Sequence, residues 1–103
     1  MNNQILLNQY AHGRMVGSRF VATPLRDQLE ETLAQQSGDV SLDFSGIMVT
    51  QSFVDELIGV LLLKHGEDIL KRLVFKGCSA DVRAIIEFVA TDRCDQYVKS
   101  HTH

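Results

Sequence analysis

The sequence VSLDFSGIMVTQSFVDELIGVLLL, from Val40 to Leu63, decides the fold of this chain. Apolar and polar residues alternate from Val40 to Phe44, which predicts a strand with one buried face. Ser45-Gly46 interrupts the apolar run, and Ile47 to Val49 resumes it. From about Ser52 to His65 the pattern predicts a helix with apolar residues on nearly every side. Such a helix has to be buried on more than one side, or covered by a partner, which indicates a layered α/β domain.

A hairpin and a helix are predicted on the N-terminal side of this stretch. Gln4 to Tyr10 and Arg14 to Val21 are separated by a short segment that contains a Gly, as in a β-hairpin. Thr23-Pro24 fits the N-cap and first position of a helix, because Pro has no amide hydrogen that needs a partner. The helix ends at Ser37-Gly38, and its leucines recur every four residues as one buried stripe: Leu25, Leu29 and Leu33.

A strand and a further helix are predicted on the C-terminal side. Leu73 to Phe75 forms the strand, and Ser79 caps a helix with apolar residues at Val82, Ile85, Ile86 and Val89. Residues 94–103 are the end of that helix or a tail that docks through Tyr97 and Val98. The element order predicts a single domain over residues 1–103, with a mixed sheet of about four strands and helices packed against it.

Composition excludes several classes of function. The 103-residue chain has a net charge of −3 and a pI near 5.7, and it has no run of Lys and Arg that could bind nucleic acid. No apolar run approaches the roughly 20 residues that cross a bilayer, and no signal peptide is recognisable, so a cytoplasmic protein is expected. Cys78 and Cys94 lack metal-ligand spacing and predict free thiols. We expect no metal and no cofactor.

Polar chemistry is densest where the strand region meets the central helix. Ser52 and Asp55 have the spacing of a capping box, in which the serine satisfies free amides of the first turn. The same helix start would also favour a bound anion or a covalent phosphate on Ser52. The cap and the phosphate site are compatible, and the sequence alone does not choose between them.

The carboxylates of the junction also have two interpretations. Asp55 and Glu56 either complement the helix dipole in the first turn or bind a partner's Arg or Arg19 of this chain. Neighbouring helical residues point about 100° apart, so the two are poorly placed as an acid/base pair and no enzyme is expected. Asp43 either faces solvent from its strand or reaches the junction. Gly59, in the middle of the helix, indicates close approach of another element.

Leu42-Asp43-Phe44-Ser45-Gly46, followed by Gln51 to Glu56, resembles the signature of the STAS-like family of small bacterial domains. Ser18-Arg19 and the helix Val82 to Val89 extend the likeness to about residues 17–93. The resemblance implies a small sheet covered by helices, shortened at the C-terminus. It also implies regulation of the kind performed by anti-sigma factor antagonists, in which a serine at the start of the second helix is phosphorylated. That position falls on Ser52 or on Phe53, which has no hydroxyl.

Three hypotheses about function follow. The first is a non-enzymatic regulatory domain whose partner is a histidine-kinase-like ATPase or an anti-sigma factor. Its binding residues would be Arg19, Asp43, Phe53, Asp55 and Glu56. The second is a sensor of a small ligand, such as a nucleotide or another anion, held at Ser52. The third is a homodimer that covers the apolar face of the central helix.

Overall fold

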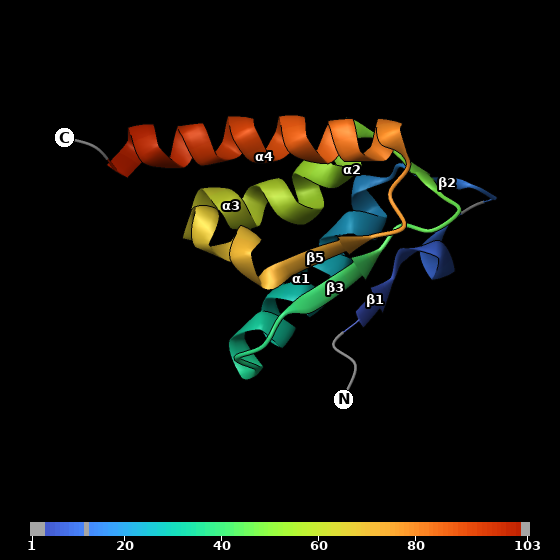
Figure 1. The fold of residues 1–103 in the computed structure, drawn as a ribbon, viewed down its shortest axis with the longest axis horizontal. Helices are drawn as coiled ribbons and strands as arrows, with labels where there is room; N and C mark the ends of the chain where they lie inside the picture. Colours follow the sequence, from blue (N-terminus) through green and yellow to red (C-terminus); the bar gives the residue numbers. More distant parts are fainter. Residues whose placement is uncertain (1–3, 12, 102–103) are drawn as a thin grey trace.

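The computed structural model describes residues 4–11 and 13–101, which form an α/β structure with two small parallel sheets (Figure 1). Three strands pair in the order β1-β3-β5, namely β1 (Gln4–Leu6), β3 (Val40–Asp43) and β5 (Leu73–Lys76). The second sheet pairs β2 (Met15–Val16) with β4 (Met48–Val49). The α/β class is therefore confirmed, whereas the single mixed sheet of about four strands is wrong for the described residues.

The predicted N-terminal hairpin is wrong. β1 pairs in parallel with β3, which places Ile5 beside Leu42, and β2 pairs in parallel with β4. A 3₁₀ helix, η1 (Leu7–Tyr10), follows β1 directly and buries Leu7 completely. The predicted turn includes His12, which lies outside the described residues. Burial of Ile5 and Leu7 in the main core explains why the chain turns away instead of pairing β1 with β2.

Helix α1 (Arg19–Gln35) begins five residues earlier than predicted. Ser18 is its N-cap, and the Ser18 hydroxyl accepts a hydrogen bond from the Phe20 amide at 3.1 Å. Pro24 therefore lies inside the helix, where it leaves the Phe20 carbonyl without its usual helical donor. Phe20 is almost fully exposed, so water can serve that carbonyl. The predicted leucine stripe is confirmed as buried: Leu25, Leu29 and Leu33.

The predicted long helix is confirmed as one continuous element, residues 51–65, which we call the central helix. It consists of α2 (Gln51–Val54), a segment of wider π-helical winding, η2 (Asp55–Gly59), and α3 (Val60–His65). Gly66 ends it with a φ of 80°, a left-handed value that glycine adopts without steric cost. η3 (Glu67–Arg72), a 3₁₀ helix, then leads into β5.

Helix α4 (Ala80–His101) is longer than the predicted helix and includes most of the predicted tail. Residues 94–101 continue it without interruption, whereas 102–103 lie outside the described residues. The Tyr97 ring lies so close to Gly66 that a Cβ there would be about 2.6 Å from a ring carbon. The end of α4 is thus packed against the end of the central helix. In Figure 1, α4 runs along one side of the molecule, over α2 and α3.

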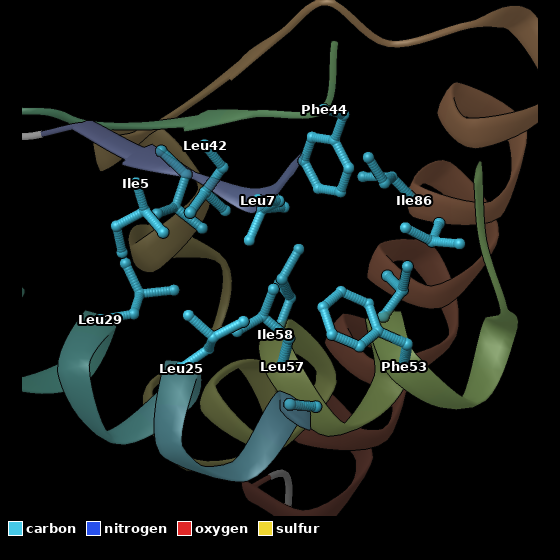
Figure 2. Packing of buried hydrophobic residues seen from close by; sticks show 14 of the residues in the cluster. Ile5, Leu7, Leu25, Leu29, Leu42, Phe44, Phe53, Leu57, Ile58 and Ile86 are labelled. Atoms are coloured by element: carbon cyan, nitrogen blue, oxygen red, sulfur yellow. The ribbon is translucent and has the colours of Figure 1, made fainter. Parts of the chain in front are cut away.

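The core lies between the three-stranded sheet and the helices. Figure 2 shows side chains from β1, η1 and β3, and Phe44 directly after β3, pointing toward those of α1 and the central helix. Ile86 of α4 lies beside them. β3 alternates buried and half-buried residues, as its sequence predicts. The opposite face of the sheet carries exposed or half-exposed residues from all three strands: Gln4, Leu6, Ser41, Asp43, Val74 and Lys76.

Candidate functional site

The junction before the central helix is capped by Thr50, not by Ser52. The Thr50 hydroxyl accepts a hydrogen bond from the Phe53 amide at 3.1 Å and donates one to the Gly17 carbonyl at 3.2 Å. The capping box predicted for Ser52 and Asp55 is therefore wrong, because Ser52 is already a helical residue. Capping by Thr50 leaves the Ser52 side chain exposed on the first turn.

Asp55 forms a bidentate ion pair with Arg93 of α4. Nε of Arg93 donates to Oδ1 of Asp55 at 2.5 Å, and Nη2 donates to Oδ2 at 2.8 Å. The Asp55 and Arg93 side chains are only 20% and 26% exposed, and the bonds to Asp55 raise the pKa of Arg93. Gly59 makes room for this pair, since a Cβ there would collide with the Asp55 carboxylate and lie 3.2 Å from Cγ of Arg93. The predicted close approach at Gly59 is confirmed.

Glu56 binds α1, which lies on the other side of the central helix from α4. It accepts from Nη1 of Arg26 at 2.9 Å and from Nη1 of Arg19 at 3.1 Å. The same Arg26 nitrogen also donates to the backbone carbonyl of Glu56 at 3.1 Å. The predicted contact between the junction carboxylates and Arg19 is thus made by Glu56. Neighbouring carboxylates bind opposite helices, because adjacent helical side chains diverge.

A cleft of about 380 Å³ opens between the start of the central helix and α4. It brings together three of the predicted site residues, Arg19, Ser52 and Asp55. Its other lining residues are Gln51, Phe88, Val89, Asp92 and Arg93. The cleft contains both cations and carboxylates, so it suits a ligand or partner that carries groups of both signs.

The other predicted residues lie elsewhere. Phe53 is fully buried in the core, so its side chain does not contribute to a binding surface here. Asp43, at the end of β3, accepts from the Ser45 hydroxyl at 2.5 Å, from the Ser45 amide at 2.8 Å and from Gln4 at 3.3 Å. The bonds from Ser45 lower the pKa of Asp43. Asp43 therefore orders the turn after β3 and does not line the cleft.

Sequence reasoning missed Arg93 and Phe88, which both line the cleft from α4. A signal for Arg93 was present, because it continues the buried stripe of Val82, Ile86 and Val89 by four residues. A cation at the next position of a buried helical stripe calls for a carboxylate on the facing helix. Phe88 offered no such signal, since its exposure depends on how α4 is rotated against the central helix.

In the part of the chain that the structure describes, no group of three or more His, Cys, Asp or Glu side chains could hold a metal ion. Cys78 and Cys94 are free thiols, and partial burial raises the pKa of each. None of the helices within residues 4–11 and 13–101 is both long and apolar enough to cross a bilayer.

A comparison with protein families matches residues 21–83 to the STAS-like domain of unknown function (DUF4325). This match covers more than half of the chain. The chain belongs to this STAS-like family. No curated protein and no solved structure matches the chain significantly. In this STAS-like domain the match includes the signature around β3 and the central helix, whereas Arg19, Phe88 and Arg93 of the cleft lie outside it.

Proposed function

We propose that this STAS-like domain is a non-enzymatic regulatory domain that binds another protein through the surface around the cleft. The observation that carries the proposal is a pair of exposed aromatic side chains. Phe88 lines the cleft and is 58% exposed, and Phe20, which follows the lining residue Arg19 in the sequence, is 92% exposed. Large aromatic residues and Arg are the side chains that contribute most to protein–protein binding, and exposing two phenyl rings to water is unfavourable without a partner.

We infer the class of partner from the resemblance of the family to better-known STAS domains. The likeness of STAS-like domains to anti-sigma factor antagonists favours a histidine-kinase-like ATPase or an anti-sigma factor. Asp55 and Glu56 serve this function as positioning residues, because each is held by an arginine of its own chain. The direct contacts fall to Phe88, Arg19 and Ser52, which line the cleft and are exposed, and to Phe20, which is exposed next to Arg19 in the sequence.

The experiment is affinity capture with the tagged domain, identification of the captured proteins, and calorimetry with the purified partner. Ser52→Ala removes an exposed side chain of the cleft, Phe20→Ala removes the exposed ring next to Arg19, and Asp27→Ala changes an exposed residue farther along α1 as the matched control. Because truncating an aromatic hot spot costs more than about 1.4 kcal/mol, Phe20→Ala should weaken binding at least tenfold. Capture of no ATPase or anti-sigma factor, or equal affinity for all variants, contradicts the proposal.

A second function, an anion or nucleotide sensor, is favoured by one observation. Ser52 shares the cleft with the guanidinium groups of Arg19 and Arg93. Both cations are already paired with carboxylates, so an anion has to compete with Glu56 and Asp55. A thermal-shift series with phosphate and nucleotides tests it, because a ligand at 100 times its Kd stabilises a protein by about 2.7 kcal/mol. A shift that is absent from Arg19→Ala would favour this function.

A further inference from the structure

The outer side of α4, facing away from the core, carries a shallow depression of about 580 Å³. All of its lining residues come from this one helix, and we call them the outer face of α4: Ala84, Glu87, Phe88, Thr91, Asp92 and Asp95. The inner side of the same helix buries Val82, Ile86 and Val89 in the core. On the outer side Ala84 and Phe88 are apolar and Phe88 is 58% exposed, so a second surface packed there would bury an aromatic ring.

The spacing of the lining residues matches helix–helix packing. A hole that accepts a side chain from a facing helix is formed by residues i, i+3, i+4 and i+7. Residues 84, 87, 88 and 91 form one such set, and residues 88, 91, 92 and 95 form the next. The two holes are four residues apart, which is about 6 Å along the helix axis. A second helix with apolar side chains at i and i+4 would therefore fill both.

The charges on the outer face of α4 favour some partner helices over others. Glu87, Asp92 and Asp95 border the two holes, and none of the six lining residues is a cation. Lys99 pairs with Asp95 at 2.9 Å and offsets its charge, whereas the group that donates to Asp92 at 2.9 Å is the neutral amide of Gln96, so the border keeps a net negative charge from Glu87 and Asp92. A second copy of α4 packed on this face would bring further carboxylates against these three, which is unfavourable. A helix with flanking Lys or Arg is electrostatically complementary.

We propose that the outer face of α4 binds an amphipathic helix of a partner protein, with apolar side chains at i and i+4 flanked by Lys or Arg. This inference rests on the proposed function, because it presumes a protein partner, and it names the partner's binding element. The outer face of α4 and the cleft share Phe88 and Asp92, so one partner can cover both.

The test uses two synthetic helical peptides, titrated into the isotope-labelled full chain and followed by amide NMR shifts. Both peptides carry Leu at i and i+4; one has Lys at the flanking positions and the other has Glu. The Lys peptide should shift the amides around Ala84, Phe88 and Thr91 and bind at least about tenfold more tightly than the Glu peptide. A double variant, Glu87→Lys with Asp95→Lys, should reverse that preference.

Two variants control for general effects of charge and folding. Asp27→Lys makes the same kind of charge change on α1 and should leave the affinity for the Lys peptide within about twofold. Phe88→Ala should weaken it about tenfold while the thermal unfolding midpoint stays unchanged, because the ring is mostly exposed.

Three outcomes overturn the inference. One is equal affinity for both peptides, or no binding of either at millimolar concentration. Another is a shift pattern confined to Arg19, Ser52 and their neighbours, which would leave the proposed function standing with a different binding element. The third is a dimer in light scattering that Phe88→Ala dissociates, which would make a second copy the occupant. Failure of this inference can be told apart from failure of the proposed function. If the domain captures an ATPase, Phe20→Ala abolishes that capture and neither peptide binds, the proposed function stands and only this inference fails.

Discussion

Helices α1 and α4 lie on opposite sides of the central helix, and they are fastened to it differently. Three groups of polar contacts attach α1 and the residues after it to the rest of the chain. Glu56 binds Arg19 and Arg26, Glu30 binds Lys64 and His65, and Arg72 donates to the carbonyls of Leu33, Gln36 and Gly38. The bonds from Lys64 and His65 also lower the pKa of Glu30.

α4 is held by its buried stripe, by the Arg93–Asp55 pair and by the contact of Tyr97 with Gly66. Beyond its first turns, the exposed side of α1 is polar, with Asp27, Gln28 and Glu31. The exposed side of α4 carries Phe88 between acidic residues. The difference teaches that α1 beyond its first turns is completed by its own chain, whereas its first turn, with Phe20, and the outer side of α4, with Phe88, each leave an aromatic ring exposed.

The largest expected effect compares an inner residue of α1 with an outer residue of α4. Leu29→Ala should lower the free energy of unfolding by about 2–5 kcal/mol, because it leaves a cavity in the core. Phe88→Ala removes a larger side chain but should change stability by less than about 0.5 kcal/mol, since its ring is largely in water already. Urea unfolding of both variants measures the difference. Similar losses in the two variants would mean that α4 is not open on its outer side.

A smaller effect distinguishes the ion pairs on the two sides of the central helix. A double-mutant cycle on Asp55 and Arg93 should give a coupling of about 1–2 kcal/mol, because the pair is bidentate and mostly shielded from water. The same cycle on Arg19 and Glu56 should give less than about 1 kcal/mol, since the Arg19 side chain is 60% exposed. Equal couplings, or a loss of both at 1 M salt, would contradict this ranking.

The smallest effect concerns Asp43, whose hydrogen bonds come from Gln4 and Ser45, outside α1 and α4, so that it provides a reference for both helices. Its pKa is lowered in the folded state, so its charge stabilises the fold above the pKa of the unfolded chain, and this contribution disappears as the pH falls through the folded pKa. Asp43→Asn should therefore cost less than about 1 kcal/mol at pH 7 and progressively less as the pH is lowered toward 2. Stability curves of both proteins across that pH range measure it. A difference that grows toward low pH would reverse the sign and refute the assignment.

Local patterns were sufficient where one face of an element is apolar. The leucine stripe of α1 and the alternation of β3 are as predicted, and in the predicted stripe of α4 Val82, Ile86 and Val89 are buried while Ile85 is half-buried. Local patterns failed where the strand partner or the helix cap is chosen by contacts between segments that are far apart in the chain. Thr23-Pro24 has the residues of a helix start, yet Ser18 supplies the cap because burial of Ala22 extends the helix toward the N-terminus.

The sequence by itself determined the α/β class, the family, the burial of the central helix on more than one side and the divergence of Asp55 from Glu56. These follow from periodicity and from helix geometry, which act over a few residues. Only the tertiary structure decided that Asp55 binds Arg93 while Glu56 binds Arg19 and Arg26, that β1 pairs with β3, and that Phe88 faces outward. Each of these depends on how elements far apart in the chain are placed against one another, because a charge or a strand edge can be satisfied by any of several distant partners.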